Sequence, residues 1–268
     1  MKKLSNILRI VFIIVLALPL ALAWLPSEVF EGLVPASLTE SGYLKSLFLS
    51  FRELSITLAA TMVFAMLLSV VLGYVSVLSM RTGRGFANIL NAIESIPSIL
   101  VALFCYAPVS GYLARHSSSA STTMSLIVFV LAATVTTLPE AVRSISIPLS
   151  DLYNRKYSLS FRSYGFTKQR ILAVLMNTGY MRNTLKRVAA DVLLKTLVLD
   201  CSFGFIIQLG FGSYGTPAHL SPGALIAAHR DALFEGGQPV LFWLPSVLLI
   251  IISVAFLIML NDTREEDE

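Results

Sequence analysis

The chain has 268 residues, of which 56% are hydrophobic and only 13% are charged, and its mean hydropathy is +0.77. Soluble domains carry about 25% charged residues, so this composition excludes an ordinary soluble protein and predicts an all-α membrane protein. The net charge of +4 would otherwise suggest nucleic acid as a partner. The placement of the basic residues, described below, explains that charge without nucleic acid.

A helix that crosses the hydrocarbon core needs about 20 mostly apolar residues, and six runs of the sequence meet this requirement. The fifth run is the least regular, because Asp191, Lys195 and Asp200 interrupt it. We expect about six transmembrane helices: an N-terminal anchor helix with an outer loop over residues 1–50, and a core of spans two to six over residues 51–268. The runs are Ile7–Trp24, Leu54–Leu78, Phe86–Tyr106, Thr122–Ile145, Val188–Leu209 and Val240–Leu260.

The first run has a second interpretation as a signal peptide. It follows the basic residues Lys2 and Lys3 and contains Ala21-Leu22-Ala23, a small-residue pattern typical of a cleavage site. Its apolar stretch is at the long end for a signal peptide. Six spans, in addition, place both termini on one side of the membrane, and the charges agree with that arrangement.

The basic residues predict which side that is. With the N-terminus in the cytoplasm, 15 of the 20 Lys and Arg residues fall on the inner side and four on the outer side. Such a bias predicts orientation by the positive-inside rule. Nine of these residues lie at the inner end of run four or in the long inner segment that follows it: Arg143, Arg155, Lys156, Arg162, Lys168, Arg170, Arg182, Lys186 and Arg187.

The inner segment from Pro148 to Arg187 favours short helices with one apolar face. Pro148 and residues 151–154 predict a break after the fourth span. Gly165 permits a turn in the middle of the segment. One interpretation is an amphipathic helix that rests on anionic lipid through Arg162, Lys168 and Arg170; another is a docking element for a soluble partner.

The inner segment resembles the cytoplasmic signature loop of ABC-importer permeases. In the peptide/nickel branch of that family the loop reads Tyr-Val-x-Ala-Ala-Arg-Ala-Leu-Gly-Ala-Ser, and Tyr157, Arg162, Gly165 and Thr167 fall in register with it. The general form of the loop begins with Glu-Ala-Ala, where this chain has Leu159, Ser160 and Phe161. Three further stretches resemble that branch in the same order: Ile93-Glu-Ser-Ile-Pro97, Leu199-Asp200-Cys-Ser-Phe203 with Leu209-Gly-Phe-Gly212, and Phe242-Trp243-Leu-Pro245.

The resemblance implies a type I ABC importer permease subunit in a bacterial inner membrane, with both termini cytoplasmic. It implies four kinds of partner: a second, homologous permease, two ATPase subunits or domains, an extracytoplasmic substrate-binding protein and membrane lipid. ATP and Mg²⁺ would bind the ATPase, since this chain has no phosphate-binding loop and is not expected to be an enzyme or to hold a cofactor or metal. The substrates of the branch include peptides, nickel chelates and cationic peptides.

The resemblance also implies that residues 157–172 form a cytoplasmic coupling helix between spans four and five, which docks on the ATPase. Phe161 and Phe166 would be apolar anchors, with Arg162 and Arg170 as peripheral charge contacts. The residues expected to couple to the ATPase are Tyr157, Ser160, Phe161, Arg162, Gly165, Phe166 and Arg170.

Ionisable residues within spans are costly and usually face a cavity or a partner. Glu140 and Arg143 are three apart and predict a local ion pair, as do Asp191 and Lys195, which are four apart. That leaves Asp200, deep in the fifth run, with two interpretations. It lines a translocation path for a cationic group, or it forms a hydrogen bond to a neighbouring helix or to the partner permease.

Two other classes of protein remain open. An ATP-independent secondary transporter or channel would be expected to show paired broken helices and inverted repeats, and the sequence has Pro97 and Pro139 in or near spans but no repeat. A membrane scaffold would bind no ATPase. His219 and His229 permit a metal site, but scattered surface histidines are far commoner.

Overall fold

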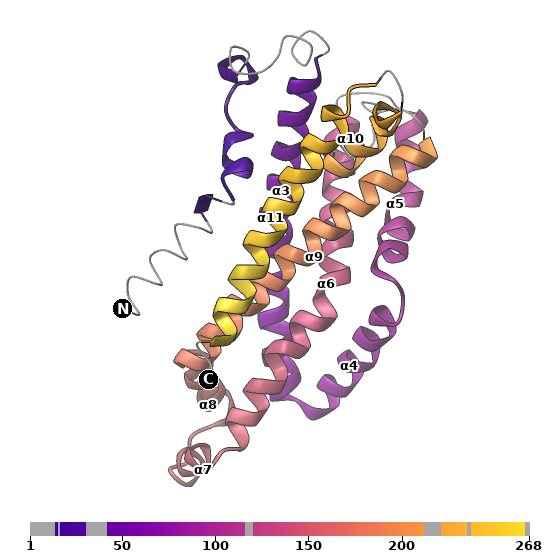
Figure 1. Cartoon of the computed structure of the whole chain (residues 1–268). Helices are drawn as coiled ribbons and strands as arrows, with labels where there is room; N and C mark the ends of the chain where they lie inside the picture. The colour runs from indigo at the N-terminus through magenta and orange to yellow at the C-terminus, as the bar shows by residue number, and fades with distance from the viewer. Residues whose placement is uncertain are drawn as a thin grey trace, which may run out of the picture.

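The computed structural model describes residues 14–15, 17–30, 42–115, 120–211, 221–234 and 237–265, and over these residues the chain is helical with no β-strand. Figure 1 shows long helices side by side, with the short helices α7 and α8 at one end and α10 at the other. The elements are η1 (Ser27–Phe30), α3 (Tyr43–Leu78), α4 (Met80–Glu94), α5 (Ser98–Arg115), α6 (Ala120–Asn154), α7 (Lys156–Ser163), α8 (Lys168–Met176), α9 (Gly179–Phe211), α10 (Pro222–Ala228), η2 (Arg230–Leu233) and α11 (Val240–Glu265).

Three helices in the described part of the chain are long and apolar enough to cross a membrane: α3, α6 over Thr123–Asn154, and α11 over Val240–Asn261. The bent pair α4 and α5 is a fourth candidate. Large apolar side chains stay exposed along these helices, among them Phe64 (52%) and Phe104 (69%). This surface suits lipid or a partner and not water, so the fold is that of an all-helical, multi-pass membrane protein.

Six spans remain a prediction. Much of the first run, Ile7–Trp24, lies outside the described residues. The fifth run lies within α9, which is 33 residues long and is not among the three apolar candidates. The ionisable residues Asp191, Lys195 and Asp200 interrupt the apolar sequence of this helix.

The third run is not one continuous helix. It breaks between Glu94 and Ser98, and the two pieces meet at 93°. Pro97 explains the break, because proline lacks an N–H and disfavours a helical conformation at the residue before it. The carbonyl of Pro97 instead accepts the first hydrogen bonds of α5, from the N–H groups of Leu100 (2.9 Å) and Val101 (3.2 Å).

The break predicted from Pro148 and residues 151–154 falls at the end of that region. α6 continues through both Pro139 and Pro148 and ends at Asn154. Proline is tolerated inside membrane helices where neighbouring groups satisfy the freed carbonyl. The chain turns at Arg155, which has the extended conformation φ −71°, ψ 156°.

Three buried clusters hold the helices together. One joins α3, α9, α10 and α11 around Leu54 and Leu225. Another joins α5, α6 and α9, where the rings of Tyr106 and Phe129 each lie 5.1 Å from that of Phe203. The third cluster, at the α7 and α8 end, consists of Ala65, Ala141, Ile145, Leu149, Leu152, Ile171, Leu172, Leu175, Met181, Val188 and Val192.

The third cluster makes a testable prediction about α8. Leu172 is fully buried, whereas Val174 on the same helix is 54% exposed. We expect Leu172→Ala to lower the free energy of unfolding by about 2–5 kcal/mol, since it leaves a cavity between α6 and α8. Val174→Ala is the matched control and should change stability by less than about 0.5 kcal/mol. Thermal unfolding in detergent measures both, and equal losses would contradict the anchoring of α8 through Leu172.

Candidate functional site

α7 ends in a turn that depends on Gly165. This residue has a φ of +79°, the left-handed conformation that glycine adopts without steric cost. The Gly165 N–H donates to the carbonyl of Arg162 (2.9 Å), and the Phe166 N–H donates to that of Phe161 (3.1 Å). These two bonds are the Schellman pattern of a helix end. The rings of Phe161 and Phe166 meet edge-on at 5.8 Å, which is the hydrophobic contact that accompanies the pattern.

The coupling segment is therefore two helices joined by a turn, not the single helix expected over residues 157–172. The turn exists because a left-handed residue ends α7 and the extended Thr167 begins α8. We call α7, the turn and α8 (residues 156–176) the α7–α8 elbow. It lies at one end of the molecule, beyond the long helices (Figure 1).

Aromatic and basic side chains cover the elbow. Tyr164 at the turn is 81% exposed, and Phe161 and Phe166 are each 37% exposed. The Arg170 guanidinium lies 4.9 Å from the centre of the Phe166 ring, a distance at which a cation and an aromatic face attract each other. The elbow thus presents three aromatic side chains and a guanidinium to the surroundings.

Arg162, which the resemblance implies as a peripheral charge contact, lies against the end of α6 in the structure. Its guanidinium lies 3.8 Å from the centre of the Tyr153 ring and donates to the Tyr153 carbonyl at 2.7 Å. That carbonyl is near the C-terminal end of α6, where backbone acceptors lack helical partners. Arg162 therefore ties α7 to α6, and the Tyr74 hydroxyl similarly donates to the carbonyl of Gln169 on α8 at 3.0 Å.

The structure thus brings five of the seven predicted coupling residues into one small region: Phe161, Arg162, Gly165, Phe166 and Arg170. Ser160 is exposed on α7 and its carbonyl accepts the Ser163 hydroxyl at 2.8 Å. Tyr157 belongs to α7, but its side chain lies outside the described side chains. Tyr164, the most exposed aromatic side chain described in the elbow, was not predicted from the sequence. Its position next to Gly165 indicates exposure, because a residue at a turn is usually exposed.

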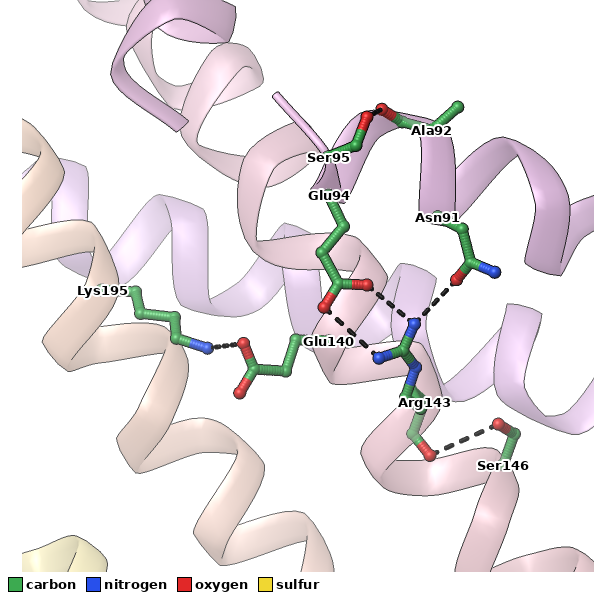
Figure 2. Close-up of polar contacts among 8 residues, drawn as sticks. All are labelled: Asn91, Ala92, Glu94, Ser95, Glu140, Arg143, Ser146 and Lys195. Carbon is green, nitrogen blue, oxygen red and sulfur yellow. Dashed lines mark hydrogen bonds and ion pairs between the residues drawn. The ribbon is translucent and has the colours of Figure 1, made fainter. Parts of the chain in front are cut away.

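A second group of functional candidates is an ion-pair cluster between α4, α6 and α9 (Figure 2). Arg143 on α6 donates to both carboxylate oxygens of Glu94 (2.8 and 3.3 Å) and to the amide oxygen of Asn91 (2.7 Å). Lys195 on α9 pairs with Glu140 on α6 and, at 2.9 Å, with Asp191. The cluster therefore joins three helices.

The predicted pair of Asp191 and Lys195 is confirmed, but the predicted pair of Glu140 and Arg143 is wrong. Both of the latter residues lie on α6, yet each reaches across to another helix. A bidentate contact with a carboxylate has better geometry for a guanidinium than an i,i+3 contact along one helix. The break at Pro97 is what brings Glu94 close enough to provide it.

Asp200 lies apart from this cluster. Asp200 is on α9 and is fully buried. It lines none of the three cavities described for this fold. In this conformation its carboxylate is closed off from those cavities. The assignment of Asp200 to a translocation path stays a prediction, as does its alternative, a hydrogen bond to a neighbouring helix or to the partner permease.

The structure describes one of the two histidines considered for a metal site. His219 lies outside the described residues. His229 follows α10, where its ring meets that of Tyr43 edge-on at 5.1 Å. Burial lowers the pKa of His229, so the imidazole is neutral at pH 7 and serves as a packing group there.

Comparison with protein-family models gave no match, and comparison with curated proteins gave none either.

Proposed function

We propose that this chain is the transmembrane permease subunit of an ATP-driven transporter, and that its α7–α8 elbow is the surface on which a soluble ATPase docks. The observation that carries the proposal is the elbow itself: an exposed aromatic turn, closed by the left-handed Gly165 and tied to the long helices. A rigid protrusion of this kind transmits force between a moving partner and the helices behind it. The resemblance of the same residues to the signature loop of ABC-importer permeases points the same way.

The contacts of α8 argue against the alternative of a helix lying on lipid. An interfacial helix needs a free apolar face to insert between headgroups. The apolar face of α8, formed by Ile171, Leu172 and Leu175, is instead buried against α6 and α9. The side chains left exposed at the turn, Tyr164 above all, suit a protein partner, since aromatic residues with a neighbouring arginine dominate protein–protein hot spots.

In the proposed complex this chain would pair with a second permease in a bacterial inner membrane, with both termini cytoplasmic. Two ATPase subunits would hold the ATP and Mg²⁺, and an extracytoplasmic binding protein would deliver the solute. The solute would be a peptide or a related cationic or chelate compound. Membrane lipid would contact the exposed apolar faces of α3 and α11.

A second candidate function is an ATP-independent secondary transporter, and one observation favours it. The α4–α5 pair is a helix broken at 93° beside charged residues, and broken helices are the elements that build ion and solute sites in secondary transporters. Such a protein would not need the α7–α8 elbow for energy, so the two candidates predict different partners.

Purification of the tagged chain from its native membrane tests the proposal. We expect an ATPase to copurify, and Tyr164→Ala to reduce the amount retained by about tenfold or more, the effect of removing an interface hot spot. Phe234→Ala is the matched control, because Phe234 is a similarly exposed aromatic (71% against 81%) at the end of η2. η2 follows α10 in the chain, and α10 lies at the end of the molecule opposite the elbow (Figure 1).

Mass spectrometry of the eluate measures the ratio of ATPase to tagged chain. No ATPase in the eluate, together with solute uptake that follows an ion gradient, would favour the secondary transporter. An ATPase retained equally by Tyr164→Ala and Phe234→Ala would mean that docking occurs on another surface.

A further inference from the structure

Two cavities lie one after the other along the groove between α6 and α9. The first, of about 470 Å³, lies between these helices and the α4–α5 break. The second, of about 540 Å³, lies nearer the α7–α8 elbow. Their linings follow the two antiparallel helices in order: Thr137, Val198 and Ser202 for the first cavity, and Ser144, Pro148 and Tyr180 for the second.

The ion-pair cluster lies at the boundary of the two cavities. Glu94 and Glu140 each line both of them. Lys195, the partner of Glu140, lines the first cavity, whereas Arg143, the partner of Glu94, lines the second. The two interhelical ion pairs therefore separate the first cavity from the second. Figure 2 shows the two pairs side by side between the helices.

The exposure of these charged groups indicates what the groove faces. The side chains of Glu94 and Arg143 are 39% and 48% exposed, and those of Lys195 and Glu140 are 35% and 53% exposed. Ionised groups open to lipid in the middle of membrane helices are costly, and those that occur face water or protein. A groove with four half-exposed charges between two hollows therefore fits a water-filled passage.

We propose that the α6–α9 groove is this subunit's wall of the solute passage, and that the pairs Arg143–Glu94 and Lys195–Glu140 form a gate across it. This inference rests on the proposed transport function but not on its coupling to ATP. It assigns the passage to the cavity-lining faces of α6 and α9 and not to Asp200, which is buried apart from both hollows.

The contacts of the gate show how it can open. Glu94 and Asn91 are both near the C-terminal end of α4, next to the 93° break, so a shift of that end relative to α6 releases both from Arg143 together. Lys195 retains its ion pair with Asp191 when α6 and α9 separate, because both residues lie on α9. Half-exposed ion pairs contribute little net stability, so the closed state is held weakly enough to open during transport.

Thiol labelling in native membranes tests the gate. The chain has two free cysteines, Cys105 and Cys201, and the background variant replaces both with alanine. Single reporters are then placed at partly buried serines: Ser202→Cys in the first cavity, Ser144→Cys in the second, and Ser253→Cys on α11 as a control outside both cavities. A charged, membrane-impermeant methanethiosulfonate is added from the side opposite the elbow.

With the ion pairs intact we expect Ser202→Cys to react and Ser144→Cys to be protected. With Arg143→Gln and Lys195→Gln together, the reaction rate of Ser144→Cys should rise at least tenfold, while that of Ser253→Cys stays the same. The charge swap Glu94→Arg with Arg143→Glu, made in the chain that retains Lys195, keeps both ion pairs with one of them reversed, and Ser144→Cys should stay protected. This variant also controls for misfolding caused by lost charges.

Two results would overturn the proposal: both cavity reporters reacting as slowly as Ser253→Cys in every background, or a rate at Ser144→Cys that the double Gln variant changes by less than twofold. Labelling needs neither ATP nor a known solute. If labelling contradicts the gate but an ATPase copurifies, the proposed function is still supported. If labelling supports the gate but no ATPase copurifies, the secondary transporter is favoured.

Discussion

Gly223→Ala is expected to cause a large loss of stability, because it forces two closely packed helices apart. A methyl group at this position would lie 1.8 Å from the carbonyl oxygen of Cys201 and 2.6 Å from its carbon. These are backbone atoms of α9, which cannot rotate away, so α10 would have to separate from α9. Overpacking a well-fitted core costs about 1–3 kcal/mol and occasionally more, and we expect the upper end of that range or beyond.

The consequence is large because α10 is buried on almost every side. Pro222, Gly223, Ala224, Leu225 and Ala227 are all buried, and Leu225 belongs to the cluster that joins α3, α9 and α11. Displacing α10 therefore opens that cluster as well. We expect the apparent melting temperature in detergent to fall by at least about 5 °C, with a lower yield of monodisperse protein.

Gly85→Ala is the matched control for this experiment. Gly85 is in the interior of α4, and no atom lies within 4 Å of the position that a methyl group would take. Alanine should therefore stabilise the helix there by about 0.5–1 kcal/mol. If Gly223→Ala and Gly85→Ala melt at the same temperature, the close approach of α9 and α10 does not exist in the folded protein.

Gly165→Ala is expected to weaken coupling by destabilising the turn between α7 and α8. Nothing lies within 4 Å of the added methyl group, so the cost comes only from the left-handed φ of +79°. That conformation costs an alanine roughly 1–2 kcal/mol. The hydrogen bonds donated by Gly165 and Phe166 should therefore open about five to thirty times more often, and the contact between Phe161 and Phe166 should loosen with them.

Hydrogen exchange of the amides of Gly165 and Phe166 measures this opening directly. In the same preparation, retention of the copurifying ATPase should fall several-fold, while membrane insertion and the melting temperature stay close to those of the unaltered protein. The control is Gly179→Ala at the start of α9, which also has open space but no left-handed φ. Equal exchange and ATPase retention in the two variants would refute the role of the turn.

The elbow was the part of the candidate site that sequence reasoning predicted best. Its signals are local: Gly165 permits a turn, apolar residues at helical spacing mark short helices, and the basic residues favour the inner side. Local signals of this kind act within a few residues of one another, so they can be recognised without knowing the fold. They did not reveal that Arg162 binds the Tyr153 carbonyl, because that contact depends on the angle between α6 and α7.

The ion-pair cluster was predicted only where both partners lie on the same helix. Asp191 and Lys195 are four residues apart and pair as expected. Arg143 pairs instead with Glu94, 49 residues earlier in the chain. Helical spacing describes neighbours on one helix and contains no information on which residue of another helix comes within reach.

Composition and charge distribution by themselves determined that this protein is helical and suited to a membrane. Local residue chemistry located the turn at Gly165. Both the class of protein and the position of the turn follow from preferences that act over a few residues. Only the tertiary structure decided the bend at Pro97, the continuation of α6 through Pro148 and the two cavities divided by ion pairs. The physical reason is that a half-exposed charge can pair with several partners, and a proline can be accommodated in a bent or a continuous helix. Packing between helices that are distant in the sequence selects one of these arrangements.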